Sequence, residues 1–270
     1  IGHLFGHLVD IPGFEDVLGD TLLIEDAAQG AGGVLQGRRS GSWGSLAVLS
    51  FGRGKGITGG GGGALLAHDE RGVHALEWVR THDPLPRPNR GGVLLMKLLA
   101  QRALGRPSLY WIPSALPFLH LGETRYHPPS PPGGAAVPSL AVVHHVLPLA
   151  EGAAKMRSVN ARRLEAAMEG SERFRAPDRV AGAEPGFLRL PAVVKRGDRA
   201  ALLGPDVRKM GVERGYPRTL DTLPSLQPLI TGPRLGLPGA DELARALITV
   251  PTHGLLSEVD LQWLERWLAE

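Results

Sequence analysis

The fold is decided by the stretch Leu49-Ser50-Phe51-Gly52-Arg53-Gly54-Lys55-Gly56-Ile57-Thr58-Gly59-Gly60, which places a primary amine on a turn walled by glycines. A compact apolar run upstream ends in Glu25-Asp26 and continues as Ala27-Ala28-Gln29. Glycines let a backbone bend closely around a ligand. The sequence therefore predicts a site in which one amine and one carboxylate, from neighbouring strand ends, face a common ligand.

Pyridoxal phosphate is the cofactor whose chemistry needs these two groups. Lys55 can form a Schiff base with the cofactor's aldehyde, and Asp26 can keep its pyridine nitrogen protonated. Ser50 ends the strand leading into the loop and can bind phosphate beside glycine amides that form an anion nest. The alternative is a solvated lysine on a flexible loop. A carboxylate ending an apolar strand weighs against that alternative, because a buried carboxylate is costly unless paired.

Composition narrows the class of protein. The 270 residues include 43% hydrophobic and 21% charged residues, as expected of a globular protein. There is no Cys, which excludes disulfides and thiolate metal sites and fits a cytoplasmic location. The net charge of +3 with 5% aromatic residues favours an Arg-rich surface over a nucleic-acid site.

Membrane and metal sites are not predicted. No apolar run reaches the roughly 18 residues that a membrane-spanning helix needs. The pairs His3/His7 and His144/His145 lack a third ligand at metal-binding spacing. The chain begins at Ile1 inside an apolar segment and without Met, which predicts a piece of a longer protein.

The first part of the chain has the pattern of an α/β sheet. We expect strands at residues 21–24, 46–51 and 63–68 and a helix at 71–82. The gap between the second and third strands is too short for a parallel crossover, which needs about a dozen residues, so these strands should be antiparallel. Glu25 and Asp26 should point to opposite faces, because side chains alternate along a strand.

The middle of the chain, residues 83–135, is apolar and irregular. Pro84, Pro86, Pro88 and Pro107 interrupt it, and the run at residues 94–99 predicts a short amphipathic helix. This region, which includes Trp111 and Phe118, is expected to form core or a subunit interface. The alternative is a surface that docks on a membrane or a lipid-linked substrate. Prolines and glycines at residues 128–134 predict a stiff linker.

The second half predicts a small α+β domain. Its expected elements are a helical segment at 139–168, a strand at 187–194, a helix at 198–210, and a last helix through Trp267 that Ser257 caps together with Asp260. The expected domains are therefore residues 1–138 and residues 139–270.

Five blocks of sequence carry a resemblance to one family. They are His3-Leu4-Phe5-Gly6-His7-Leu8-Val9-Asp10, Ile24-Glu25-Asp26-Ala27-Ala28-Gln29-Gly30-Ala31-Gly32, Gly37-Arg38-Arg39-Ser40-Gly41-Ser42-Trp43-Gly44, Ser50-Phe51 through Gly63-Ala64, and Leu247-Ile248-Thr249-Val250-Pro251-Thr252-His253 with Leu256-Ser257 and Asp260. Together they resemble the DegT/DnrJ/EryC1/StrS sugar aminotransferases over most of the chain. These are pyridoxal phosphate enzymes of fold type I, the aspartate aminotransferase-like fold.

The resemblance implies a role for each matching residue. Lys55 is expected to bind the cofactor covalently and to shuttle the proton, while Asp26 pairs with the pyridine nitrogen. Gln29 is expected near the ring hydroxyl, Ala28 against the ring face, and Ser50 on the phosphate. Some relatives carry His at the lysine position and act as dehydratases, so Lys55 argues against that branch.

Two departures from the family pattern stand out. The chain starts at the segment that normally follows the family's amino-terminal part, so an amino-terminally truncated large domain (residues 1–138) is expected beside the small carboxyl-terminal domain. The family's Asn-Tyr-Arg segment, whose Asn reaches the cofactor of the neighbouring subunit, is replaced here by Ser130-Pro131-Pro132-Gly133-Gly134.

The implied activity is amino transfer from an amino acid, with glutamate as the expected donor, to a keto sugar that is expected to be nucleotide-linked. Such reactions serve polysaccharide or secondary-metabolite biosynthesis, and the intact protein is expected to be a cytoplasmic homodimer. The alternative from another class is a non-catalytic or regulatory family member, or a fragment without cofactor, that keeps the scaffold.

Overall fold

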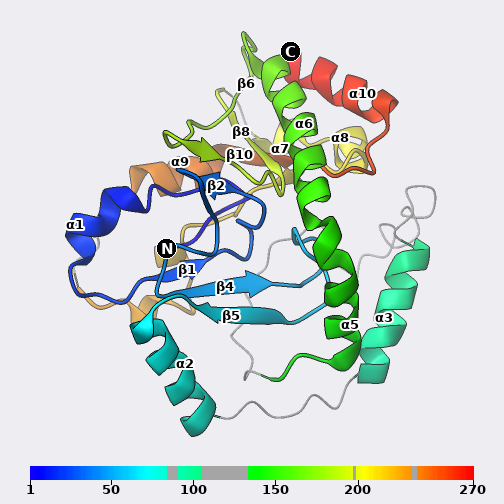
Figure 1. The fold of residues 1–270 in the computed structure, drawn as a ribbon. Helices are drawn as coiled ribbons and strands as arrows, with labels where there is room; N and C mark the ends of the chain where they lie inside the picture. The colour runs from blue at the N-terminus through cyan, green and yellow to red at the C-terminus, as the bar shows by residue number, and fades with distance from the viewer. Residues whose placement is uncertain (84–90, 105–132, 197–198, 233–235) are drawn as a thin grey trace. The chain divides into compact units, whose positions relative to one another are not determined.

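The computed structural model describes residues 1–83, 91–104, 133–196, 199–232 and 236–270 (Figure 1). Backbone packing divides the chain into two compact units. Unit 1 comprises Ile1–Leu119, Pro131–Val159 and Arg179–Leu188, and unit 2 comprises His120–Ser130, Asn160–Asp178 and Arg189–Glu270. Each unit has its own sheet.

The sheet of unit 1 has the strand order β1-β4-β5. Its strands are β1 (Ile24–Asp26), β4 (Leu46–Ser50) and β5 (Gly63–Ala67). β1 pairs with β4 in parallel, and β4 pairs with β5 antiparallel over five residues (Figure 1). The expected antiparallel neighbours are confirmed. Asp26 and Ser50 consequently end adjacent parallel strands at one edge, where open α/β sheets bind ligands.

The first strand corrects one expectation. Residues 21–24 were predicted as a buried strand, but β1 starts at Ile24 and continues through Glu25 and Asp26. Ile24 is 47% exposed and Asp26 is exposed, whereas Glu25 is fully buried. The two carboxylates do point to opposite faces, as alternation requires. The buried carboxylate is therefore Glu25, because side-chain alternation and not local hydropathy decides which residue faces inward.

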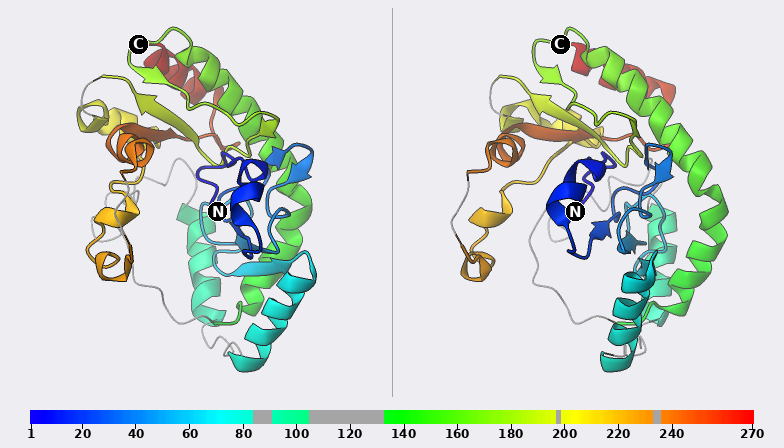
Figure 2. Two further views of the ribbon diagram at one scale, coloured as in Figure 1. Left: turned by 90° about the vertical axis from the view of Figure 1, so that its left-hand side faces the viewer. Right: turned by 60° about the vertical axis from the view of Figure 1, so that its left-hand side comes forward.

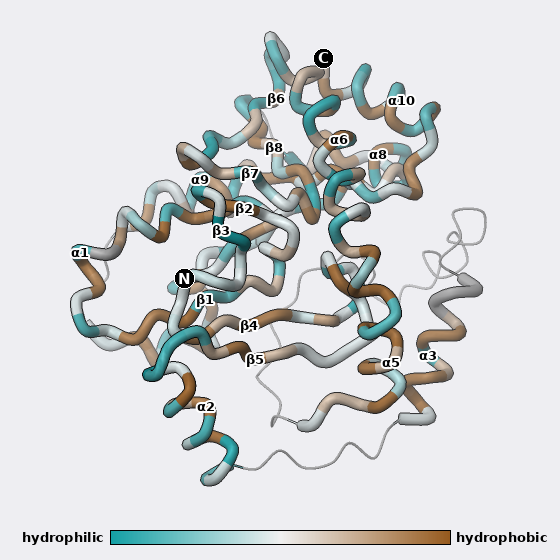
Figure 3. The backbone as a smooth tube through the Cα atoms, viewed as in Figure 1, coloured by the Kyte–Doolittle hydropathy of each residue, from teal (hydrophilic) through white to brown (hydrophobic). Residues whose placement is uncertain are grey.

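Helices complete the described part of unit 1. They are α2 (Glu70–His82), α3 (Gly91–Leu104), α5 (Val137–Val146) and the first half of α6 (Ala150–Met168), with the 3-10 turn Leu147–Leu149 between the last two. The side chain of Asp69 caps α2 by accepting a hydrogen bond from the Gly72 amide. α3 packs against α5, as Figure 2 shows, and is apolar along most of its length (Figure 3). The predicted helices at 71–82 and within 139–168 are confirmed.

A second, smaller sheet in unit 1 has the order β3-β2-β7. Its strands are β2 (Val34–Leu35), β3 (Arg38–Arg39) and β7 (Ala183–Glu184). Leu35 packs with Leu8 and Ile11 in an apolar cluster. The short helical turns Pro12–Phe14 and α1 (Glu15–Leu18) follow Ile11 in sequence.

Unit 2 is built on an antiparallel sheet of order β6-β8-β10-β9. Its strands are β6 (Phe174–Arg175), β8 (Leu190–Val194), β10 (Leu247–Val250) and β9 (Glu213–Arg214). Its helices are α7 (Arg199–Leu202), α8 (Pro205–Lys209), α9 (Pro238–Ala246) and α10 (Glu258–Ala269), with 3-10 turns at Leu220–Thr222 and Gln227–Leu229. Phe174, Leu264 and Leu268 are fully buried and form part of its core.

Two predictions about this half have different outcomes. The capping box of Ser257 and Asp260 at the start of α10 is confirmed. The single helix expected at 198–210 is wrong over the described residues 199–210, because Gly204 and Pro205 end one short helix and start another. Backbone packing groups residues 139–159 with unit 1, whereas the sequence places them after the boundary at residue 138. The division into residues 1–138 and 139–270 stays a prediction.

Several expectations fall on residues that the structure does not describe. These are the prolines between residues 84 and 90, Pro107, Trp111, Phe118, and most of the linker at 128–134. The expected helical run at 94–99 lies within α3 and is confirmed. Among the helices that the structure describes, none is long and apolar enough to cross a membrane.

Candidate active site

Lys55 lies on the loop between β4 and β5. The loop is closed at its neck by hydrogen bonds from the Phe51 amide to the Gly62 carbonyl (2.9 Å) and from the Gly59 amide to the Phe51 carbonyl (2.8 Å). At its tip the Lys55 amide donates to the Gly52 carbonyl (3.3 Å). Gly54, Gly60 and Gly62 have φ angles of +74°, +78° and +83°, which side chains disfavour. The glycines are therefore part of what presents Lys55.

Lys55 and Asp26 interact electrostatically. The Lys55 side chain is half-buried, and burial lowers the pKa of its ammonium group, while the negative charge of Asp26 acts in the opposite direction. Desolvation favours the neutral amine, which is the form that attacks a carbonyl. The charge of the Asp26 carboxylate therefore acts on the amine that the sequence singled out.

Ser50 lies beside the same loop. Its hydroxyl oxygen accepts a hydrogen bond from the Gly52 amide at 3.3 Å. A Cβ atom on Gly52 would lie 3.4 Å from Ser50 Oγ and 3.8 Å from Lys55 Cγ. The Ser50 hydroxyl and the stem of Lys55 therefore both flank the α-carbon of Gly52.

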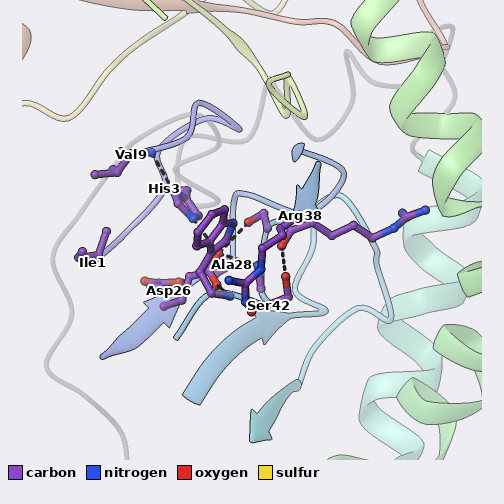
Figure 4. A network of polar contacts seen from close by, with 12 residues as sticks. Ile1, His3, Val9, Asp26, Ala28, Arg38 and Ser42 are labelled. Atoms are coloured by element: carbon purple, nitrogen blue, oxygen red, sulfur yellow. Dashed lines mark hydrogen bonds and ion pairs between the residues drawn. The ribbon is translucent and has the colours of Figure 1, made fainter. Parts of the chain in front are cut away.

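Ala28 and Gln29 form the turn after β1. The Ala28 amide donates to Asp26 Oδ1 at 3.0 Å, which orients that carboxylate and leaves Oδ2 without a hydrogen bond among the described residues (Figure 4). Gln29 Oε1 accepts a hydrogen bond from the Phe5 amide at 3.0 Å. The Gln29 carbonyl is thus engaged in holding the segment that precedes β1.

Sequence reasoning missed a buried polar network next to these residues. Glu25 and His3 form its centre, with Nε2 of His3 at 2.9 Å from Oε1 of Glu25. Two features of the sequence pointed to this network. Side chains alternate along a strand, so one of two adjacent carboxylates in β1 must face inward, and a histidine lies in the preceding segment. Sequence reasoning also passed over Arg157 on α6, which is buried and donates to the carbonyls of Gly186 (3.1 Å) and Ala31 (3.5 Å).

Arg157 also lies against the Lys55 loop. A Cβ atom on Gly56 would be 3.2 Å from the Ala31 carbonyl oxygen and 3.4 Å from Nη2 of Arg157. Burial lowers the pKa of the Arg157 guanidinium. The residue after Lys55 is therefore packed closely, and glycine at position 56 is the residue that fits.

The donor set agrees with the requirements of pyridoxal phosphate. That cofactor needs an amine with a lowered pKa, a carboxylate oxygen that is not engaged by the protein, and hydroxyl or amide donors for phosphate. Lys55 Nζ, Asp26 Oδ2 and the Ser50 hydroxyl are groups of these kinds. No group of three or more His, Asp or Glu residues that could hold a metal ion occurs in the described ranges.

Comparisons with known proteins agree with this reading of the fold. Residues 1–88 match the model of the DegT/DnrJ/EryC1/StrS aminotransferase family. The block at residues 247–260 lies beyond the matched range. No curated protein matches the chain.

Solved structures extend the likeness to the whole chain. The chain matches a DegT DnrJ EryC1 StrS aminotransferase from Brucella abortus with a TM-score of 0.70 at 20% identity, covering 99% of this chain and 62% of the other. The sugar aminotransferase CalS13 from Micromonospora echinospora matches with a TM-score of 0.70 at 20% identity, over 99% and 65%.

A third structure is GDP-4-keto-6-deoxymannose-3-dehydratase (ColD), solved as a mutant with bound GDP-perosamine. It matches with a TM-score of 0.70 at 16% identity, over 99% of this chain and 66% of the other. The chain thus spans less than two thirds of the length of each of these three proteins. The comparisons thus support the resemblance over residues 1–88, which match the model of the DegT/DnrJ/EryC1/StrS aminotransferase family, and the chain as a whole has the fold of the fold type I aminotransferases.

Proposed function

We propose that the protein to which this chain belongs is a pyridoxal phosphate-dependent aminotransferase that transfers an amino group from an amino acid to a keto sugar. The observation that carries this proposal is the position of half-buried Lys55 on the glycine loop that follows β4, beside the strand end that carries Asp26, whose negative charge acts on the pKa of Lys55. Both residues lie at the carboxyl edge of a parallel strand pair, and both fall within the range matched by the family model.

The proposed roles follow from the chemistry of each side chain. When bound, pyridoxal phosphate supplies an electron sink that allows a carbon–hydrogen bond of the substrate to be broken. Lys55 Nζ would hold the cofactor covalently; once the amine of the amino-acid substrate has displaced it, the freed Lys55 amine would accept and return the substrate proton. Asp26 Oδ2 keeps a proton on the pyridine nitrogen. Ser50 Oγ and the amides of the glycine loop bind phosphate.

Gln29 and Ala28 have proposed supporting roles. Gln29 lies near the ring hydroxyl in this proposal, while its carbonyl oxygen holds the Phe5 amide. Ala28 packs on the ring face, and its amide orients Asp26. These two residues would set the plane of the ring relative to Lys55.

The substrates are proposed from the likeness to sugar-acting proteins. CalS13 is a sugar aminotransferase and ColD was solved with bound GDP-perosamine, so a nucleotide-linked keto sugar is the proposed acceptor. Glutamate is the proposed amino donor. A cytoplasmic homodimer acting in polysaccharide or secondary-metabolite biosynthesis completes the proposal. Light scattering on the purified protein tests the oligomeric state, and fractionation of producing cells tests the location.

The first experiment measures cofactor binding. The purified chain is incubated with pyridoxal phosphate, treated with borohydride to fix any lysine adduct, digested, and analysed by mass spectrometry. We expect the adduct on Lys55, its loss in Lys55→Ala, and its retention in the control Lys155→Ala, which removes an exposed lysine paired with Glu151.

The second experiment measures amino transfer. The cofactor-loaded protein is mixed with glutamate, and 2-oxoglutarate is quantified by mass spectrometry before and after addition of a nucleotide-linked keto sugar. Absence of the adduct on Lys55, both in this chain and in a version extended at its amino terminus, would contradict the proposal and favour a non-catalytic family member.

A further inference from the structure

Glu25 is a fully buried carboxylate that none of the proposed catalytic roles uses. Its oxygens accept hydrogen bonds from four donors, which are the Gly41 amide (2.6 Å), the Trp43 amide (2.8 Å), His3 Nε2 (2.9 Å) and the Ser40 hydroxyl (3.4 Å). A buried charge is tolerated when its lone pairs are satisfied in this way. The residue next to Glu25 in the strand is Asp26.

His3 connects the two acidic residues. Its Nδ1 accepts a hydrogen bond from the Val9 amide (3.2 Å), so the ring proton of the neutral imidazole lies on Nε2 and is donated to Glu25 (Figure 4). Its main-chain amide donates to the carbonyl of Asp26 at 3.1 Å. One residue therefore holds the side chain of Glu25 and the main chain of Asp26.

The main chain of Asp26 is held from both sides. Its amide donates to the Ile1 carbonyl (2.8 Å), and its Cα pairs with Val48 of β4. The side chain is oriented by the hydrogen bond that the Ala28 amide donates to Oδ1. The backbone hydrogen bonds keep β1 paired when the Glu25 anchor is lost. The Ile1–His3 segment, which holds the main chain of Asp26, would then lose its side-chain anchor, and the position of Asp26 would loosen with it.

We propose that Glu25 and His3 are positioning residues that fix the direction of the Asp26 carboxylate and, through it, the affinity for pyridoxal phosphate. The part about the cofactor rests on the proposed function. The part about the direction of Asp26 concerns this chain alone. In this proposal Glu25 and His3 affect cofactor binding only through the orientation of Asp26.

The test uses variants that change the network but keep its shape. Glu25→Gln has the same volume, but its amide group meets donors from His3, Gly41 and Trp43, so at least one of them loses its acceptor. His3→Phe is the second variant and removes both ring hydrogen bonds while leaving the backbone donors of Glu25. Leu35→Ala is the control, because it creates a cavity in a neighbouring apolar cluster of the same unit and removes no hydrogen bond of the network.

The first readout needs no cofactor. Hydrogen exchange of the Ala28 amide, followed by NMR, reports the bond to Asp26 Oδ1. We expect exchange about tenfold faster in Glu25→Gln or His3→Phe than in Leu35→Ala, under conditions where all three are folded. Equal exchange at Ala28 in the network variants and in the control would overturn the proposal.

The second readout is a double-mutant cycle on the dissociation constant of pyridoxal phosphate. Glu25→Gln should weaken binding about tenfold in the wild-type background and less than about twofold in the Asp26→Asn background, because residues acting through one another are not additive. Equal weakening in both backgrounds would reduce the pair to a structural role and overturn the proposal.

The two readouts separate this inference from the proposed function. If the wild-type chain binds no pyridoxal phosphate while exchange at Ala28 still responds to Glu25→Gln, the proposed function fails and the positioning of Asp26 stands. If pyridoxal phosphate binds and neither readout responds, the proposed function stands and the positioning role fails.

Discussion

The buried ring nitrogen Nε2 of His7 neither accepts nor donates a hydrogen bond among the described residues. Its ring meets Phe187 edge to face, with centroids 5.6 Å apart. Burial, and secondarily the charge of Arg179, lowers the pKa of His7 from 6.5 to about 4. The folded protein therefore holds this imidazole neutral where the unfolded chain binds a proton.

The sign of the pH effect follows from that difference. Stability contributed by neutral His7 is fully present above pH 6.5 and is lost as the pH falls from 6.5 towards 4, by roughly 3 kcal/mol in total. We expect urea denaturation to show falling stability across this window, and His7→Phe to remove most of the fall. An unchanged slope in His7→Phe would contradict the assignment.

Glu25 makes stability depend on pH in a second range, which lies below that of His7. Burial raises its pKa, but the hydrogen bonds from His3, Gly41 and Trp43 outweigh burial and lower the pKa from 4.5 to about 2. Stability from a depressed carboxylate is present above pH 4.5 and is lost as the pH falls towards 2. His7→Phe should leave this lower window unchanged, which separates the two groups in one titration of stability.

The sequence predicts single residues unevenly. The roles of Lys55 and Asp26 could be proposed because their chemistry depends on residue type and neighbouring glycines. The sequence could not show that Glu25, and not Asp26, is buried. Side chains alternate along a strand, but in a strand of three residues only the neighbouring elements determine which face is the inner one. The donors to Glu25 come from residues 3 and 40–43, which only the fold brings together.

At the scale of elements, Gly72 in α2 is a position where alanine should destabilise the protein, although alanine has the higher helix propensity. A Cβ atom on Gly72 would lie 2.0 Å from the carbonyl oxygen of Ser45, which is main chain and cannot move away cheaply. Alanine normally stabilises a helix over glycine by up to about 1 kcal/mol. Overpacking costs about 1–3 kcal/mol, so Gly72→Ala should destabilise on balance.

Gly152 in α6 is the matched control. A Cβ atom there meets nothing within 4 Å, so Gly152→Ala should stabilise by up to about 1 kcal/mol. Urea denaturation of both variants measures the free energy of unfolding. Stabilisation by Gly72→Ala would mean that the helix and the loop at Ser45 are not packed as described.

The start of α10 allows a second prediction at this scale. Ser257 Oγ accepts a hydrogen bond from the Asp260 amide (3.2 Å), and Asp260 Oδ2 accepts one from the Ser257 amide (2.8 Å). Ser257→Ala should therefore lower the free energy of unfolding by about 1 kcal/mol. Ser225→Ala, which changes an exposed serine without side-chain hydrogen bonds among the described residues, should have almost no effect, and an equal loss in both would contradict the cap.

Elements were predictable where the signal is local. The strands β4 and β5 and the helices α2 and α10 follow from hydrophobic period and caps within their own residues. The short pairs β2–β3 and β2–β7 were not predictable, because strands of two residues have no period and β7 lies about 150 residues after β2. The break between α7 and α8 was a missed local signal, Gly204-Pro205.

At the scale of the whole molecule, every residue proposed to hold the cofactor lies in unit 1. Lys55, Asp26, Ala28, Gln29 and Ser50 all precede residue 119, whereas the sheet β6-β8-β10-β9 belongs to unit 2. A ligand stabilises only the structure that it binds, by about 2.7 kcal/mol at a concentration one hundred times its dissociation constant. Pyridoxal phosphate should therefore stabilise unit 1 selectively.

Differential scanning calorimetry tests this selectivity. We expect two transitions, because each unit has its own sheet and buried core. Leu35→Ala should lower the transition that pyridoxal phosphate raises, and Leu264→Ala, in the core of unit 2, should lower the other one. If pyridoxal phosphate and Leu264→Ala instead move one shared transition in opposite directions, the two units unfold together.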